Sequence, residues 1–219
     1  MMMSLKNITK FYKDGNLEYR ALYNISFDID YGEYVFIYGG SGSGKTTLLN
    51  ILGCMDTFDY GKYTFCDMDI GNKKDIELSR LRNEKFGFIS NSIKLIPELN
   101  LFENVGIPLL YSKFSKEEKR ERILKYLSMF SIEKYKYLSI DSLCKKDKQM
   151  ACIARALVGG AKIIIGDEPC KYLERSDCKE IFEILFSLNK QGITLIISGA
   201  ELNPYLDVGK VINLRDGMM

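Results

Sequence analysis

A glycine-rich stretch followed by a lysine and two threonines carries the most specific chemistry in this sequence. It reads Gly39-Gly40-Ser41-Gly42-Ser43-Gly44-Lys45-Thr46-Thr47. An apolar run at 34–38 precedes it and another at 48–52 follows it. Glycines leave the backbone without Cβ atoms, so successive N–H groups can turn toward phosphate oxygens. A buried strand, this loop and a helix in that order predict a phosphate-binding loop, and the complete pattern argues against a chance glycine turn.

Two side chains at the end of the loop can contact a bound nucleotide directly. The Lys45 ammonium can reach the β- and γ-phosphates, and the Thr46 hydroxyl can hold Mg²⁺. The helix expected to begin near Thr46 adds the positive end of its dipole. These features predict that residues 39–47 bind the phosphates of a nucleotide together with Mg²⁺.

Two acidic residues, Asp167 and Glu168, end the segment 162–168, whose middle is an apolar run of three isoleucines. On its own, such a pair is commonly a solvated strand end. Downstream of a phosphate loop, a carboxylate at the end of a central strand can hold Mg²⁺ directly or through water. We therefore expect Asp167 to lie close enough to Thr46 to share one Mg²⁺, and Glu168 to polarise an attacking water as a general base.

Antiparallel β-structure is expected on the N-terminal side of the loop. Alternating residues at 5–11 and 21–29, with a polar turn at 14–16, predict two paired strands. Tyr12 stands at the end of the first strand. Its ring could stack on an adenine, but packing aromatics look the same in sequence, and the residues alone favour an ordinary half-buried tyrosine.

The rest of the chain alternates between strands and helices, with one helical interruption. Strands are expected near 61–66, 86–90, 162–166 and 194–197, helices at 75–83 and around 178–188, and a last edge element at 208–215. From 94 to 157 the pattern is helical, with a capping box at Ser115 and Glu118. The sequence thus predicts one α/β domain over 1–219 with an antiparallel β part. Its core, 1–93 and 158–219, has a mixed sheet with flanking helices, and 94–157 forms a helical subdomain.

Composition narrows the class of protein. The 219 residues are 46% hydrophobic, enough for a substantial core, and the formal net charge of +2 is too small to indicate a nucleic-acid partner. There is no histidine and the six cysteines show no C-x-x-C spacing, so free thiols in a reducing compartment are expected in place of a zinc site. No apolar run approaches the ~20 residues that span a bilayer, and the first residues lack the order of a signal peptide. Any membrane contact is therefore expected to come through a partner.

The order of these parts resembles the nucleotide-binding subunits of ATP-binding-cassette (ABC) transporters over essentially the whole chain. Within that family it looks most like the ATPases of macrolide-export and lipoprotein-release systems. The segments that carry the resemblance are 48–56, 103–109, 153–157 and 215–217.

The resemblance implies ligands and partners. It implies a P-loop NTPase core that binds ATP and Mg²⁺, with Tyr12 stacked on the adenine, which reverses the interpretation from the residues alone. It implies head-to-tail pairing with a second ABC subunit, identical or different, and attachment to a membrane permease. The chain would then be cytoplasmic and peripheral on the inner face of the cell membrane.

Four places depart from the family's pattern. Where the family carries Leu-Ser-Gly-Gly-Gln, this chain has Leu143-Cys144-Lys145-Lys146-Asp147. The glutamine that senses Mg²⁺ and the transmembrane partner is Asn91, an amide that could still serve the metal. The histidine that contacts the γ-phosphate is Ala200, and the aspartate that follows the acidic pair is Glu174. Two lysines in place of glycines add bulk and exclude glycine-only backbone geometry, although their charge can still attract phosphate.

The residues expected to hold ATP are therefore present, whereas those expected to act on the transition state are partly lost. Removing one group that stabilises the transferring phosphoryl can cost ~10²–10³-fold in rate. One hypothesis is an active ATPase subunit that drives export of a peptide, drug or lipoprotein through a separate permease. The other is an ATP-binding but catalytically weak partner, structural or regulatory, of a more complete subunit. We favour an ABC transporter subunit with impaired turnover. A nucleic-acid-linked or repair ATPase of the same superfamily is disfavoured because no basic stripe or coiled-coil arm is visible.

Overall fold

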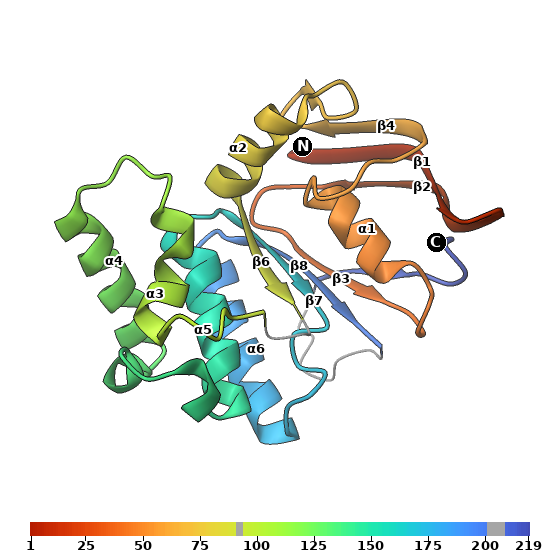
Figure 1. Ribbon diagram of the computed structural model, residues 1–219. Helices are drawn as coiled ribbons and strands as arrows, with labels where there is room; N and C mark the ends of the chain where they lie inside the picture. Colours follow the sequence, from red (N-terminus) through yellow and green to blue (C-terminus); the bar gives the residue numbers. More distant parts are fainter. Residues whose placement is uncertain (91–93, 201–208) are drawn as a thin grey trace.

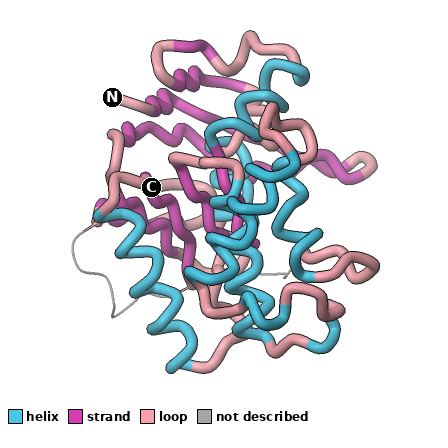
Figure 2. Tube along the Cα trace, turned by 90° about the vertical axis from the view of Figure 1, so that its left-hand side faces the viewer, coloured by secondary structure: helices cyan, strands magenta, loops and turns pink. Residues whose placement is uncertain are grey.

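The computed structural model describes residues 1–90, 94–200 and 209–219 (Figure 1). Their elements form two β-sheets and a group of helices. Most of the helices lie at the end of the molecule away from the N-terminal strands, as both views show (Figures 1 and 2).

The first part of the chain builds an antiparallel sheet with the strand order β2-β1-β4-β5. Its strands are β1 (Met3–Asp14), β2 (Leu17–Ile29), β4 (Tyr60–Phe65) and β5 (Met68–Asp69). β1 and β2 form a long hairpin in which Tyr12 pairs with Tyr19. Buried and exposed residues alternate along the second half of β2, so one face of this sheet turns toward the core.

A second sheet is parallel in all of its described pairings and has the order β6-β7-β8-β3-β9. Its strands are β3 (Tyr34–Tyr38), β6 (Phe86–Ser90), β7 (Ile163–Asp167), β8 (Thr194–Gly199) and β9 (Lys210–Asn213). Parallel strands are covered on both faces, which explains their nearly continuous apolar runs. Because β3, β8 and β7 are neighbours, the segments that follow their carboxyl ends meet at one edge of the sheet.

Six α-helices and three short 3₁₀ helices are present among the described residues. They are α1 (Lys45–Leu52), α2 (Asp75–Lys85), α3 (Leu101–Gly106), α4 (Lys116–Met129), α5 (Lys145–Val158) and α6 (Arg175–Lys190), with η1 (Ile107–Leu109), η2 (Glu133–Tyr135) and η3 (Ile140–Ser142). The predicted capping box is present at the start of α4. Glu118 N–H donates to Ser115 Oγ at 3.2 Å, and Ser115 N–H donates to Glu118 Oε2 at 2.7 Å.

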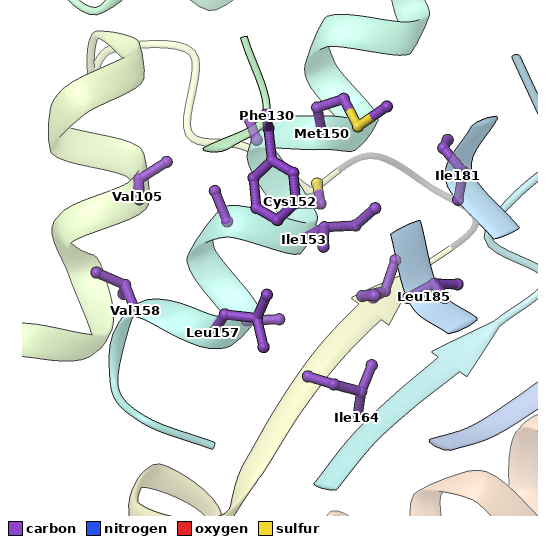
Figure 3. Close-up of a cluster of buried hydrophobic side chains, with 14 of the residues drawn as sticks. Val105, Phe130, Met150, Cys152, Ile153, Leu157, Val158, Ile164, Ile181 and Leu185 are labelled. Carbon is purple, nitrogen blue, oxygen red and sulfur yellow. The ribbon is translucent and has the colours of Figure 1, made fainter. Parts of the chain in front are cut away.

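Alternate residues of the parallel strands belong to two hydrophobic clusters. Ile165 of β7 packs with α1 and the antiparallel sheet, whereas Ile164 packs with helices on the other face. Figure 3 shows this second cluster, with Val105 from α3, Leu157 from α5 and Leu185 from α6. The core of the predicted helical stretch is thus continuous with the core beside the sheet.

The predicted α/β class with a separate antiparallel part is confirmed. Element ends differ slightly, since β4 begins at Tyr60 and α2 continues to Lys85. The last strand begins at Lys210, inside the predicted 208–215, of which 208 lies outside the described residues. The stretch 94–157 supplies α3, α4 and nearly all of α5, and its division from the core as a subdomain stays a prediction.

Candidate functional site

The phosphate loop joins β3 to α1, and the backbone of two other segments packs closely against it. Gly44 has a φ of +98°, and a Cβ there would lie 2.6 Å from the carbonyl oxygen of Ala21. A Cβ on Gly39 would lie 2.1 Å from the carbonyl oxygen of Leu214. Both positions therefore require glycine, one for its left-handed backbone and both for space.

Lys45 lies beneath this loop with its side chain 6% exposed. Its Nζ donates to the carbonyl oxygens of Gly39 at 2.7 Å and Gly40 at 2.9 Å. The same ammonium forms an ion pair with Glu168 Oε1 at 3.2 Å. The loop and the end of β7 are therefore joined through one lysine.

The side chains of Thr46 and Asp167 meet at the carboxyl edge of the parallel sheet. Thr46 Oγ1 donates to Asp167 Oδ2 at 2.9 Å, although the two residues are 121 positions apart in the chain. Ser198, at the end of β8, donates its hydroxyl to Asp167 Oδ1 at 2.7 Å. Hydroxyl and carboxylate oxygens are ligands that Mg²⁺ takes in proteins beside nucleotide phosphates, so this set of donors fits the ion.

Glu168 has an unusual backbone and two cationic neighbours. Its φ of +44° lies in the left-handed region that non-glycine residues rarely adopt, and its N–H donates to Ser198 Oγ at 3.0 Å. Besides Lys45, Lys171 Nζ contacts Glu168 Oε2 at 2.9 Å. Burial alone would raise the pKa of this carboxyl, but hydrogen bonds and charges from Lys171 and Lys45 outweigh it and hold the pKa below its usual value. Glu168 is therefore ionised at neutral pH.

The hydroxyl group of Tyr12 is held by Asp56, which lies in the loop after α1. The hydroxyl donates to Asp56 Oδ2 at 2.5 Å, and Lys10 Nζ pairs with Asp56 Oδ1 at 3.0 Å. The Tyr12 ring lies 5.6 Å from the Tyr19 ring, centroid to centroid. Burial and the bond to Asp56 raise the pKa of Tyr12 to about 12, while a hydrogen bond with the Thr47 side chain acts in the opposite direction.

Most of the predicted site residues thus lie along one edge of the parallel sheet. Gly40, Ser41, Gly42 and Thr46 are exposed, whereas Gly39, Ser43 and Lys45 are buried. Asn91, predicted to contact Mg²⁺, lies outside the described residues.

Three residues at the site were missed in the sequence. Ser198 and Asp56 contact predicted site residues from distant positions, and Lys171 does so from three residues beyond Glu168. A serine at the end of a buried strand is a weak signal, which only the neighbouring acidic strand makes informative.

The segment that departs from the family's pattern begins α5. Cys144 is the residue before the helix, and its Sγ accepts a hydrogen bond from Asp147 N–H at 3.4 Å. Lys146 pairs with Glu180 of α6, and this contact raises the pKa of the Lys146 ammonium. Lys145 is exposed. One of the two lysines is therefore already occupied by a carboxylate of its own chain.

Ala200 follows β8 directly and is exposed. Its methyl group offers no hydrogen bond to a phosphate. None of the helices formed by the described residues has the length and apolar character needed to cross a bilayer.

Comparison with known proteins shows the family to which this chain belongs. A family model described as ABC transporter matches residues 22–171. The uncharacterized ABC transporter ATP-binding protein YknY of Bacillus subtilis (strain 168) is 35% identical over 216 residues, which cover 99% of this chain and 94% of YknY. The macrolide export ATP-binding/permease protein MacB of Pasteurella multocida (strain Pm70) is 37% identical over 216 residues. This chain matches MacB over 99% of its own length but spans only 33% of MacB.

Solved structures agree with these relatives. The ATP-binding cassette MJ0796, in a dimeric post-hydrolysis state bound to ADP and Pi, superposes with a TM-score of 0.90 at 35% identity, covering 99% of this chain and 96% of that one. The cbiO1 subunit of Clostridium perfringens, part of the ABC transporter complex cbiONQ, superposes with a TM-score of 0.86 at 25% identity, covering 99% and 86%.

Proposed function

This chain belongs to the ABC transporter family as an ATP-binding subunit related to a macrolide-export ATPase, and from this premise we propose that it binds Mg²⁺-ATP but hydrolyses it slowly. Two parts of the chain contrast, and this contrast carries the proposal. Lys45, Thr46 and Asp167 lie together at the phosphate loop. The start of α5 instead carries lysines where the family has glycines, and Lys146 is bound to Glu180.

We assign ATP contacts as follows. The amides of residues 39–47 and the Lys45 ammonium bind the phosphates, and Lys45 exchanges its loop carbonyls for phosphate oxygens. Tyr12 stacks on the adenine. Thr46 and Asp167 hold Mg²⁺, and Asn91, outside the described residues, contributes an amide. When bound, Mg²⁺ supplies positive charge that stabilises the phosphate oxygens.

Glu168 is the group we propose as general base. Water attacks the γ-phosphorus while the bond to the β,γ-bridging oxygen breaks, and the proton of the water passes to the Glu168 carboxylate, leaving ADP and phosphate. The ionised state of Glu168 suits a proton acceptor. Its ion pairs with Lys45 and Lys171 hold it at the end of β7 but also lower its basicity.

Slow turnover would follow from the groups that this chain lacks at an ATP site formed between two paired subunits. A family partner subunit presents glycine backbone and a serine hydroxyl to the γ-phosphate, whereas this chain presents Cys144, Lys145 and Lys146. Ala200 removes a second contact to the same phosphate. Since one such group is commonly worth ~10²–10³-fold, a pair of identical chains would carry two losses at each site and turn over very slowly.

We propose a membrane permease and a second ABC subunit as partners. MacB is named as a macrolide export protein with ATP-binding and permease parts. This chain matches 33% of its length. Export of a drug, peptide or lipoprotein through a separate permease is the function favoured for this chain, which would place it on the cytoplasmic side of the membrane. The departures from the family's pattern at the start of α5 equally support a second role, in which this chain is a regulatory partner of a more complete subunit.

Purified protein tests binding and turnover separately. Mg²⁺-ATP at millimolar concentration is expected to raise the melting temperature, because a ligand that binds only the folded state stabilises it. Lys45→Ala is expected to abolish the shift, whereas Lys190→Ala, at the far end of α6, serves as the control and keeps it. An unshifted wild-type melt would rule out the nucleotide site.

The turnover arm uses the same protein with a phosphate-release assay. Hydrolysis barely above background, beside a clear melting shift, is the expected result. Robust hydrolysis that Glu168→Gln abolishes would contradict slow turnover and leave a conventional transporter ATPase.

A further inference from the structure

The buried hydroxyl of Ser198 links the two acidic residues that end β7. Ser198 is 1% exposed. Its Oγ donates to Asp167 Oδ1 at 2.7 Å and accepts the N–H of Glu168 at 3.0 Å. A serine hydroxyl has one hydrogen to donate and two lone pairs to accept with, so both bonds form at once.

We propose that Ser198 is a positioning residue that prepares Asp167 for Mg²⁺ and fixes the backbone of Glu168. This inference rests on the proposed function, because it names how the chain's own residues arrange the Mg²⁺-ATP site. Ser198 itself contacts neither nucleotide nor metal in this assignment; it acts through the two acidic residues.

Both oxygens of Asp167 have a partner, and this restricts the carboxylate to one orientation. Oδ2 accepts from Thr46 at 2.9 Å, and Oδ1 accepts from Ser198. Without Ser198, the one remaining bond to the Asp167 carboxylate among the described residues would be that from Thr46, which is exposed, so the carboxylate would rotate more freely. A metal ligand held by a second residue needs less rearrangement on binding, and removing such a support commonly weakens metal binding ~10–100-fold.

The backbone of Glu168 needs support of a different kind. Its φ of +44° is unfavourable for a residue with a Cβ and persists only where surrounding contacts impose it. Lys45 and Lys171 hold the side chain, whereas Ser198 holds the N–H. Among the described residues, the hydrogen bond to Ser198 is therefore the side-chain contact made by the backbone N–H of Glu168.

Thr194 supplies a matched control for a merely structural hydroxyl. It begins the same strand, β8, is also 1% exposed, and its Oγ1 accepts the N–H of Gly32 at 2.9 Å. Thr194→Val and Ser198→Ala each remove one buried hydroxyl that accepts a backbone N–H from a neighbouring segment. They differ in lying at opposite ends of the strand, and the acidic residues are at the Ser198 end.

The first measurement is the Mg²⁺ concentration at half-maximal thermal shift with fixed ATP. Ser198→Ala is expected to raise this midpoint by about tenfold or more, while the shift given by ATP in EDTA stays unchanged. Thr194→Val is expected to lower the melting temperature but keep the wild-type midpoint. Ser198→Thr retains the hydroxyl and is expected to return the midpoint to the wild-type value.

The second measurement needs no nucleotide. Hydrogen exchange followed by mass spectrometry is expected to show faster exchange of the Glu168 amide in Ser198→Ala than in Thr194→Val. A Mg²⁺ midpoint for Ser198→Ala within twofold of wild type would overturn the proposal, and so would equal Glu168 exchange in the two variants. If wild type shows no ATP-dependent shift, the proposed function fails, and the exchange measurement still decides whether Ser198 positions Glu168.

Discussion

At the scale of single residues, Lys45 is positioned by the phosphate loop to which it belongs. Two loop carbonyls accept its hydrogen bonds, and Glu168 balances its charge. A buried ammonium without such partners would be strongly unfavourable. The side chain is therefore ordered by its own loop, and less conformational entropy is lost when phosphate oxygens replace the carbonyls.

Tyr12 is ordered by a comparable arrangement, in which Asp56 accepts its hydroxyl hydrogen and Lys10 neutralises Asp56. Its pKa of about 12 keeps the phenol protonated over the physiological range, so the bond to Asp56 persists there. Tyr19 lies beside the ring as a second aromatic. Under the proposed stacking on adenine, Asp56 would fix the plane of the Tyr12 ring.

Substitution of Tyr12 separates stacking from hydrogen bonding. Tyr12→Ala is expected to weaken ATP binding by about 1–3 kcal/mol, because the stacking surface is lost. Tyr12→Phe keeps that surface and is expected to lose much less, through a less ordered ring. Calorimetric titration with ATP measures both, with Lys190→Ala as the control. Equal affinity in Tyr12→Ala and wild type would show that the ring does not stack on the base.

At the scale of elements, the start of α5 carries two lysines where the family's pattern has glycines. Cys144 provides only a weak sulfur cap, and Lys146 joins α5 to α6 through Glu180. That pair is half exposed, and exposed ion pairs contribute about 0–1 kcal/mol. Removing Lys146 is therefore expected to change the charge at the start of α5 but to have little effect on the stability of the fold.

Repair of this element tests the turnover hypothesis. The combined change Cys144→Ser, Lys145→Gly, Lys146→Gly and Ala200→His is expected to raise ATP hydrolysis far beyond the sum of the separate changes, because groups acting on one transition state are non-additive. Two glycines at a helix start cost about 1 kcal/mol each, which the fold should tolerate. Phosphate release measures the rate.

Two controls make the repair interpretable. Ala200→His alone is expected to help little, since the partner's phosphate would still meet lysine side chains in place of glycine backbone. Glu168→Gln in the repaired chain is expected to abolish the gain if Glu168 is the base. Repaired protein that binds ATP and hydrolyses it no faster than wild type would exclude the α5 start and Ala200 as the cause of slow turnover.

At the scale of the whole molecule, the site lies on an open edge. The phosphate loop, Asp167 and Ser198 stand at the carboxyl ends of β3, β7 and β8, and several loop residues are exposed. α5 and α6 pack on the other face of the sheet from α1. The MJ0796 structures that superpose on this chain are dimeric.

ATP is therefore expected to drive association of two copies. Glu168→Gln with millimolar Mg²⁺-ATP should elute as a dimer in size-exclusion chromatography with light scattering, because ATP holds the two chains together while hydrolysis is blocked. The same variant without nucleotide should elute as a monomer, and Lys45→Ala with ATP should too. A monomer under all conditions would argue against self-pairing and favour a different second subunit.

Much of this arrangement was accessible from the sequence because it depends on neighbouring residues. The phosphate loop is one contiguous stretch, and local backbone geometry alone brings its glycines, lysine and threonine together. Strands β3, β7 and β8 are apolar runs because both faces of a parallel sheet are buried, and the capping box of α4 spans four residues. The α/β class and the acidic pair followed from the same local patterns, whereas the departures at α5 and Ala200 followed from the resemblance to the ABC family.

Only the tertiary structure decided the contacts between segments that are far apart in the chain. Asp56 reaches Tyr12 across 44 positions, Ser198 reaches Asp167 across 31, and Glu180 reaches Lys146 across 34. A hydroxyl or carboxylate on one strand or helix acquires its role from which element packs beside it. Strand order sets that neighbour: β8 lies between β7 and β3, so the hydroxyl of Ser198 falls between the acidic pair and the phosphate loop.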